Sequence, residues 1–229
     1  MADRCLDDEL ASQARIAMEE GGARVFRYGE GSPFIDFRLP CGSGLDVLID
    51  PTPDRAALHR CLADLEARRA TALPLACELL AERHYLPPLR IVLLGAGSEV
   101  AALEKLATAQ GIAIERLEAG GDLSLGRAPG WLEADPWTAV LLLFHDHEWE
   151  HALLEWALGT PAFYIGAQGG APARETRLDR LRASGHDDAA LARITSPIGL
   201  IPRARDPGVL ALSILAEVVG AYEALHPHR

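Results

Sequence analysis

A cysteine at the start of a glycine-rich turn is the first group in the sequence that could do chemistry. Residues 37–49 read FRLPCGSGLDVLI, with Cys41 followed by Gly42 and Gly44 between two strand-like runs. Glycine allows positive φ angles and lets the backbone approach a ligand closely. A thiolate there could bind a soft metal or a sulfur-containing group, whereas a free cysteine is often a small buried hydrophobe. From the residues alone, both interpretations carry equal weight.

A second glycine turn follows an apolar run at residues 91–94. Gly95 and Gly97 could form the turn of a dinucleotide site, where the backbone approaches a pyrophosphate at a helix N-terminus. Glu118 lies about 20 residues further on, at the predicted end of the next strand, where an acid could bind a ribose hydroxyl. Val100 occupies the place of the third glycine of that motif. A turn that binds no nucleotide is therefore an equal alternative.

The segment 145–151, HDHEWEH, follows another apolar run. His147 and His151 are four positions apart, so a helix would bring them together, and neutral imidazoles are ligands for zinc and other transition metals. The simpler interpretation is a strand that ends at His145 and leads into a helix capped by Asp146. We favour this polar rim over a metal site, because ligands of open α/β sheets bind at the carboxyl ends of the strands.

A glycine-rich loop after the segment 162–166, AFYIG, is the last candidate. Tyr164 and Gly166 lie at the predicted strand end, and Gly169 and Gly170 lie in the loop that follows. The loop could approach the same ligand as the polar rim at 145–146. Considered by itself, a flexible connection is the plainer interpretation.

Composition restricts the class of partner. The 229 residues carry a net charge of −11, from 22 basic and 33 acidic side chains, and no run is strongly basic, so a nucleic-acid partner is disfavoured. The four cysteines form no CxxC pair and the chain begins without a signal segment, which indicates a reducing cytoplasm. The apolar stretch 209–225 is interrupted by Glu217 and is short for a membrane span, so no membrane partner is expected.

Residues 1–85 are predicted to form a small α+β domain. Helical patterns at 7–22 and 54–70 flank strand-like runs that are separated by glycine and proline turns. Cys61 lies among the apolar positions of the second helix and Cys77 lies in a further apolar segment, so both are expected to pack in the core.

Residues 86–229 are predicted to form a Rossmann-like α/β domain that begins after the proline pair at 87–88. The continuously apolar runs at 91–94 and 138–144 are typical of strands buried on both faces of a sheet. Helical segments separate these strands, and such βαβ alternation predicts a parallel sheet with right-handed crossovers.

Several stretches together resemble the XdhC/CoxI family. They are FHDHE, PAFYIGAQG, RLDRLRASG, ARITSPIGL and ARDPGVLALSILAEVV in the second half, and YGEGSPFIDFRLPCGSGLDVLIDP and the GAG turn before them. The resemblance covers nearly the whole chain, and the combination is much more specific than any single glycine motif. Members of the family have a small N-terminal domain and a Rossmann-like C-terminal domain.

The resemblance implies an accessory protein for molybdenum hydroxylases of the xanthine dehydrogenase and aldehyde oxidase type. Such a protein would bind the molybdenum cofactor, or its cytidine dinucleotide form, protect it during sulfuration and help insert it into the apoenzyme. It would be a maturation factor rather than a catalyst. Its expected partners are the apo-hydroxylase and a cysteine desulfurase, and self-association is expected.

The resemblance also assigns roles to residues. Cys41 matches the cysteine of the family's CGGG loop and would present a thiolate to the molybdenum centre, with the backbone of Gly42 and Gly44 near the pterin. The remaining cofactor-binding positions that it implies lie at strand ends, and the nucleotide or phosphate end of the cofactor is expected near the first two of them: Gly95, Gly97, Glu118, His145, Asp146, Tyr164 and Gly166.

Three departures from the family pattern qualify these expectations. Cys5 matches a family cysteine but lacks the two glycines that precede it, and the segment before it is missing, so the N-terminal domain is expected to be truncated. The third glycine of the turn is Val100, and the family's GSRR after YIG is absent, so two phosphate-binding arginines are expected to be missing.

The alternative functions are an NAD(P)-binding oxidoreductase, a metal-dependent hydrolase or nucleotidyl transferase that uses HDHEWEH, and a scaffold with a dead site.

Overall fold

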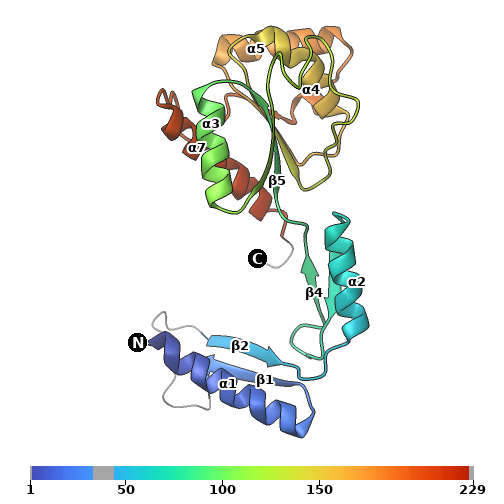
Figure 1. Cartoon of the computed structure of the whole chain (residues 1–229), viewed down its shortest axis with the longest axis vertical. Coiled ribbons are helices and arrows are strands. Elements are labelled where there is room, and N and C mark those ends of the chain that lie inside the picture. The colour runs from blue at the N-terminus through green and yellow to red at the C-terminus, as the bar shows by residue number, and fades with distance from the viewer. Residues whose placement is uncertain (1, 33–43, 227–229) are drawn as a thin grey trace. The chain divides into compact units, whose positions relative to one another are not determined.

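The computed structural model describes residues 2–32 and 44–226, with side chains from residue 7 onward. The chain divides into two compact units, Met1–Tyr85 and Leu86–Arg229. Figure 1 shows the elements of each unit, and the units are described in turn.

The first unit contains two helices and two antiparallel strand pairs. Strand β1 pairs with β2, and β3 pairs with β4. Its elements are α1 (Ala2–Glu20), β1 (Arg24–Gly29), β2 (Gly44–Ile49), α2 (Arg55–Glu66), β3 (Thr71–Pro74) and β4 (Glu82–Tyr85). The pair β3–β4 was not anticipated from the sequence, because each strand has only four residues and shows no clear alternation.

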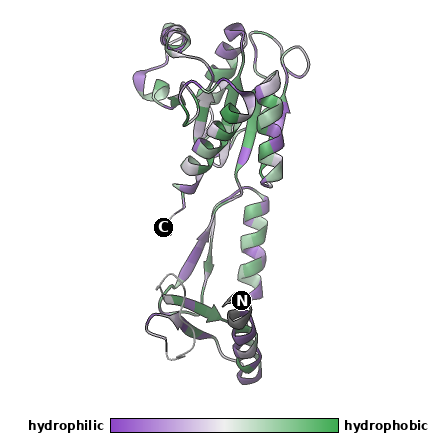
Figure 2. Cartoon of the chain, turned by 90° about the vertical axis from the view of Figure 1, so that its left-hand side faces the viewer, coloured by the Kyte–Doolittle hydropathy of each residue, from purple (hydrophilic) through white to green (hydrophobic). Residues whose placement is uncertain are grey.

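Helix α2 begins directly after Asp54, which caps its first turn. The Asp54 carboxylate accepts hydrogen bonds from the backbone N–H groups of Ala56 and Ala57, which satisfies two of the four free donors at the helix start. Hydrophobic and hydrophilic residues alternate along this helix in Figure 2. Cys61 is buried, as expected, with its Sγ 3.4 Å from the carbonyl oxygen of Ala72 on β3. Cys77 instead lies half-buried in the irregular turn between β3 and β4.

The second unit is a five-stranded parallel sheet in the order β6-β5-β7-β8-β9. The predicted Rossmann-like sheet is therefore confirmed. Its strands and helices are β5 (Arg90–Gly95), α3 (Ser98–Ala109), β6 (Ala113–Leu117), β7 (Thr138–Leu143), the 3₁₀ turn η1 (His147–Trp149), α4 (Glu150–Leu158), β8 (Tyr164–Ala167), α5 (Ala171–Ala183), α6 (Asp188–Leu191), β9 (Ile194–Thr195) and α7 (Pro207–Glu223). Among the described helices, none has the length and apolar character that a membrane crossing requires.

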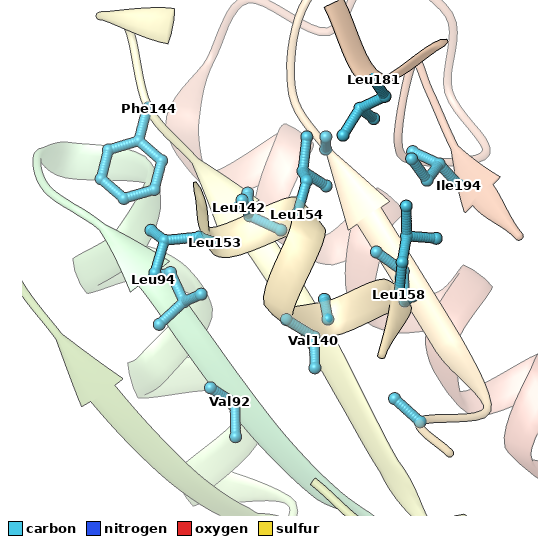
Figure 3. Packing of buried hydrophobic residues seen from close by; sticks show 14 of the residues in the cluster. Val92, Leu94, Val140, Leu142, Phe144, Leu153, Leu154, Leu158, Leu181 and Ile194 are labelled. Atoms are coloured by element: carbon cyan, nitrogen blue, oxygen red, sulfur yellow. The ribbon is translucent and has the colours of Figure 1, made fainter. Parts of the chain in front are cut away.

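Hydrophobic layers cover both faces of this sheet. Alternate residues of β5 and β7 point to opposite faces, so Val92 and Val140 pack toward α4 and α5, as Figure 3 shows in part. Ile91 and Leu141 pack toward α3 and α7 on the other face. Figure 1 shows α3 and α7 beside one another, apart from α4 and α5. Burial on both faces explains why β5 and β7 are continuously apolar rather than alternating.

The strand order places the loops that could bind a ligand at one edge. All five strands are parallel, so their carboxyl ends lie together. From β5 the chain goes first to β6 on one side and then to β7 on the other, which makes the gap between β5 and β7 a topological switch point. The loops at 96–97, 144–146, 168–170 and 196–206 follow β5, β7, β8 and β9 and form this carboxyl edge.

Candidate functional site

The glycine turn after β5 is shaped by close backbone packing. Gly95 has φ +152°, and a Cβ at this position would lie 2.2 Å from the carbonyl oxygen of Leu143 on β7. Only glycine fits there without moving a strand. Gly97 has φ +108° and caps α3 without a side-chain hydrogen bond. Val100, which replaces the third motif glycine, is fully buried against the sheet.

Carboxylates surround this turn. Glu99 lies in the first turn of α3, with its side chain 15% exposed, and its Oε2 is 3.7 Å from Nε2 of His145 after β7. Glu118 at the end of β6 is contacted by the Arg116 guanidinium, which also donates to Glu104 over 2.7 Å. That hydrogen bond to Glu104 is the largest cause of the raised pKa of Arg116. The glycine turn is therefore an acidic part of the edge.

The HDHEWEH segment does not assemble a metal site. Within the described part of the chain, no group of three or more His, Cys, Asp or Glu side chains could hold a metal ion. His147 Nδ1 lies 3.2 Å from Glu150 Oε2, whereas His151 Nε2 lies 3.1 Å from Ser184 Oγ. Asp146 accepts a hydrogen bond from the N–H of Glu148 and caps η1. The capping interpretation is confirmed.

A buried arginine that the sequence analysis missed joins three loops of the carboxyl edge. Arg177 on α5 donates Nε and Nη2 to the Glu150 carboxylate over 2.9–3.1 Å, and both side chains are less than 5% exposed. Its Nη1 donates to Ser196 Oγ over 2.7 Å, and its Nη2 donates to the Gln168 carbonyl over 2.7 Å. Glu150 follows β7, Gln168 follows β8 and Ser196 follows β9. No local sequence signal marks Arg177, because its partners lie 9 to 27 positions away.

A cleft of this edge lies beyond β8 and β9 and has a volume of about 650 Å³. One wall is the loop after β8 and the start of α5, and the other is the loop after β9. The lining residues are Gln168, Gly169, Gly170, Ala171, Pro197, Ile198, Gly199, Ile201, Pro202, Arg203, Ala204 and Leu210. The walls are mostly apolar, and Arg203 is the only charged member of the set, which makes the cleft suitable for a flat ring with an anionic group.

Polar groups of α7 anchor the loop after β9. Ser213 Oγ accepts the N–H of Ile201 over 2.6 Å, and Glu217 Oε2 accepts the N–H of Gly199 over 2.5 Å. Gly199 has φ +102°, and a Cβ there would lie 2.8 Å from Ser213 Oγ. The loop is therefore held in one conformation by a buried hydroxyl and a half-buried carboxylate.

Tyr164 and Gly166 lie in β8 beneath the cleft. Tyr164 is 7% exposed and packs in the core. Burial, followed by the charge of Glu217, raises the pKa of Tyr164 well above its usual value. A Cβ at Gly166 would lie 2.4 Å from Cδ1 of Ile198, so this glycine lets the loop after β9 pack on the strand. Their cofactor-binding roles stay predictions.

The cysteine turn of the first unit is only partly described. Cys41 and Gly42 lie outside the described residues. Gly44 is the first residue of β2, opposite Gly29 on β1, and a Cβ at Gly44 would meet the side chain of Arg27. That side chain also pairs with Asp46 over 2.8 Å.

Comparisons with known proteins agree with the fold. A family model described as the XdhC Rossmann domain matches residues 91–218. The chain is 33% identical to the molybdenum cofactor insertion chaperone PaoD of Escherichia coli (strain K12), over 93% of this chain and 71% of that protein. A crystal structure described as a xanthine dehydrogenase from Bacillus halodurans has a TM-score of 0.68, with 19% identity, and the match covers 97% of this chain and 82% of that one. This last likeness concerns the fold alone.

Proposed function

The chain belongs to the XdhC family, and on this basis we propose that it binds the molybdenum cofactor and assists its insertion into a molybdenum hydroxylase. The observation that carries the proposal is the 33% identity with a molybdenum cofactor insertion chaperone across 93% of the chain. A match of this extent includes the first unit as well as the Rossmann-like unit. The cofactor would be cargo that the protein holds and releases rather than a group on which it performs catalysis.

The carboxyl edge of the sheet has features that suit this cargo. The molybdenum cofactor has a flat pterin, a dithiolene that binds the metal and an anionic phosphate. The cleft of about 650 Å³ has apolar walls for a ring and an arginine for an anion, and its volume is in the range of small-molecule sites. Arg177, Ser213 and Glu217 hold its loops in place, so little ordering is required when a ligand binds.

The finer assignments are part of the proposal. Cys41 would supply a thiolate to the molybdenum centre, because a soft sulfur ligand suits such a metal. The protein would hold the cofactor, in its plain or cytidine dinucleotide form, while a cysteine desulfurase provides sulfur for sulfuration, and would then deliver it to an apo-hydroxylase of the xanthine dehydrogenase or aldehyde oxidase type. We also propose that the chain self-associates and acts in the cytoplasm.

Cofactor retention tests the proposal. The wild-type protein and two variants, Cys41→Ser and Cys77→Ser, are incubated without oxygen with molybdenum cofactor released from a donor enzyme. After gel filtration, pterin and molybdenum are measured in the protein peak. Cys77 is the matched control, because it is a half-buried thiol in a turn of the same unit.

We expect retention by the wild type and by Cys77→Ser, and loss of molybdenum in Cys41→Ser. Retention by all three proteins would keep the function but remove Cys41 as a ligand. No retention by any of them would refute the proposed function. A parallel fluorescence titration with NADPH addresses the oxidoreductase alternative, since tight binding with turnover of a carbonyl compound would favour it instead.

A further inference from the structure

We infer that the phosphate-bearing end of the cargo binds in the cleft beyond β8 and β9, with Arg203 as its cation, and not at the glycine turn after β5. The inference deepens the proposed function and rests on it. Both forms of the cofactor carry phosphate, as a monoester or as a diphosphate, so the same site would serve either form.

The charge of the glycine turn argues against an anion there. Glu99 is in the first turn of α3 with little exposure, and Glu118 is at the end of the neighbouring strand β6. Asp146 follows β7 on the other side of the turn. The cations nearby are already paired, since Arg116 contacts both Glu104 and Glu118. A phosphate at Gly97 would meet Glu99, whose Oε2 lies 3.4 Å from the position of a Cβ there, without a cation of its own, and like charges oppose binding.

The cleft beyond β8 and β9 has the opposite character. None of its twelve lining residues is acidic, although the chain carries 33 acidic side chains and a net charge of −11. Arg203 is the one charged residue of the lining. Among the described residues, no carboxylate forms an ion pair with it, so its guanidinium remains available for a phosphate, which it can bind with two parallel hydrogen bonds.

The backbone around Arg203 is unusual in a way that fits a binding role. Arg203 has φ +58°, a left-handed conformation that is uncommon for a residue other than glycine. Such conformations are retained where the surroundings enforce them, and they occur often at ligand sites. Here the surroundings are α7, since Ile201 donates its N–H to Ser213 Oγ and Gly199 donates its N–H to Glu217. The arginine is thus presented on a loop that is fixed before any ligand arrives.

The apolar walls of the cleft would receive the rest of the bound group. Ile198, Ile201 and Leu210 contribute large side chains, and Pro197 and Pro202 stiffen the loop between them. A ring attached to the phosphate can pack on these surfaces while the phosphate meets Arg203. We therefore assign the site to a phosphate ester of a flat ring compound.

The test measures binding of cytidine diphosphate and of inorganic pyrophosphate by calorimetry at low ionic strength. The proteins are the wild type, Arg203→Gln, Arg203→Lys and the matched control Arg205→Gln, an exposed arginine two residues away that does not line the cleft. A fifth protein, Glu99→Gln, reports on the glycine turn. Circular dichroism confirms that each variant is folded.

We expect Arg203→Gln to weaken binding of both probes by about tenfold, since one charge-assisted pair is lost. Arg203→Lys should recover part of that loss, and Arg205→Gln and Glu99→Gln should stay within about twofold of the wild type. Binding that is unchanged in Arg203→Gln but tighter in Glu99→Gln would place the phosphate at the glycine turn and overturn the inference. No binding of either probe by the wild type at millimolar concentration would also overturn it.

Molybdenum cofactor retention by the same proteins separates this inference from the proposed function. If the wild type and Arg203→Gln retain cofactor equally, the function stands and the phosphate site is wrong. If the probes bind through Arg203 but the wild type retains no cofactor, the site stands and the function is wrong.

Discussion

Removal of the Arg177 guanidinium should be among the most damaging single changes in the second unit. In Arg177→Met, the Glu150 carboxylate, which is 3% exposed, loses the guanidinium that binds it through two nitrogens, and only the His147 imidazole, 3.2 Å away, stays beside it. The Ser196 hydroxyl and the Gln168 carbonyl lose a hydrogen bond each. Methionine retains most of the arginine's apolar stem, so the variant tests the charge and its bonds rather than the volume.

The expected loss of stability is about 4–5 kcal/mol. Breaking a buried ion pair by removing one partner costs about 3–5 kcal/mol, because the remaining charge is buried and uncompensated. The two further bonds contribute about 1 kcal/mol each, of which water can restore part. A domain has a total stability of about 5–15 kcal/mol, so the variant should be close to unfolding at ordinary temperature.

Urea unfolding followed by tryptophan fluorescence reports the stability of the second structural unit, to which Arg177 belongs. All four tryptophans, at positions 131, 137, 149 and 156, belong to the second unit. With a slope of about 2 kcal/mol per molar urea, the midpoint should fall by about 2 M. The matched control is Arg174→Met, an exposed arginine on the same helix, which should change stability by less than about 0.5 kcal/mol.

The double variant Glu150→Leu with Arg177→Met measures the interaction energy between the two side chains. Replacing both partners with apolar residues should recover at least about 2 kcal/mol relative to Arg177→Met alone, because no unpaired charge remains. Our reasoning is refuted if Arg177→Met lies within about 1 kcal/mol of the wild type. It is also refuted if the double variant is as unstable as the sum of the two single variants.

Three further predictions follow from the geometry. Gly95→Ala should lose at least about 2 kcal/mol in urea unfolding, since its Cβ would clash with a strand backbone, whereas Gly111→Ala, at φ +72° with open space, should lose only about 1 kcal/mol. Burial and the charge of Glu217 raise the pKa of Tyr164, so the contribution of its neutral hydroxyl to stability is complete below about pH 10 and is lost as the pH rises further. The unfolding free energy of Tyr164→Phe should therefore drop less between about pH 9 and about pH 11 than that of the wild type. An equal drop in both proteins would contradict this. Glu217→Ala should leave the Gly199 N–H unpaired, cost about 1–2 kcal/mol and speed hydrogen exchange in the loop 196–203, and unchanged exchange would show that the carboxylate does not anchor it.

Much of the second unit could be read from local patterns. The apolar runs that became β5 and β7 predicted strands buried on both faces, because only such strands lack a polar face. The Gly95 turn predicted a tight connection into a helix, and Asp146 predicted a cap. These signals depend on residues that are close in sequence, and their physical causes are local. They are the conformational freedom of glycine, the hydrogen bonds of a helix cap, and the pattern of buried residues along a strand.

The side-chain contacts at the carboxyl edge of the sheet could not be predicted from such local patterns. His147 and His151 have the spacing of metal ligands, yet each contacts a different partner: His147 lies beside Glu150, and His151 lies beside Ser184. Arg177 itself has nothing in its neighbourhood to distinguish it from the other arginines of α5. The short strands β3 and β4 were missed because four residues carry too little periodicity.

The sequence by itself determined the family and the class of fold, and it predicted the edge of the sheet at which we propose that a ligand binds. Periodic burial and turn chemistry encode the order of strands and helices, and parallel strands must present their carboxyl ends together. Only the tertiary structure decided which loops meet there, since the sheet order brings to Arg177 partners that lie up to 27 positions from it in the sequence. The charge of each part of the edge, acidic at the glycine turn and basic at Arg203, likewise depends on which side chains the fold leaves paired.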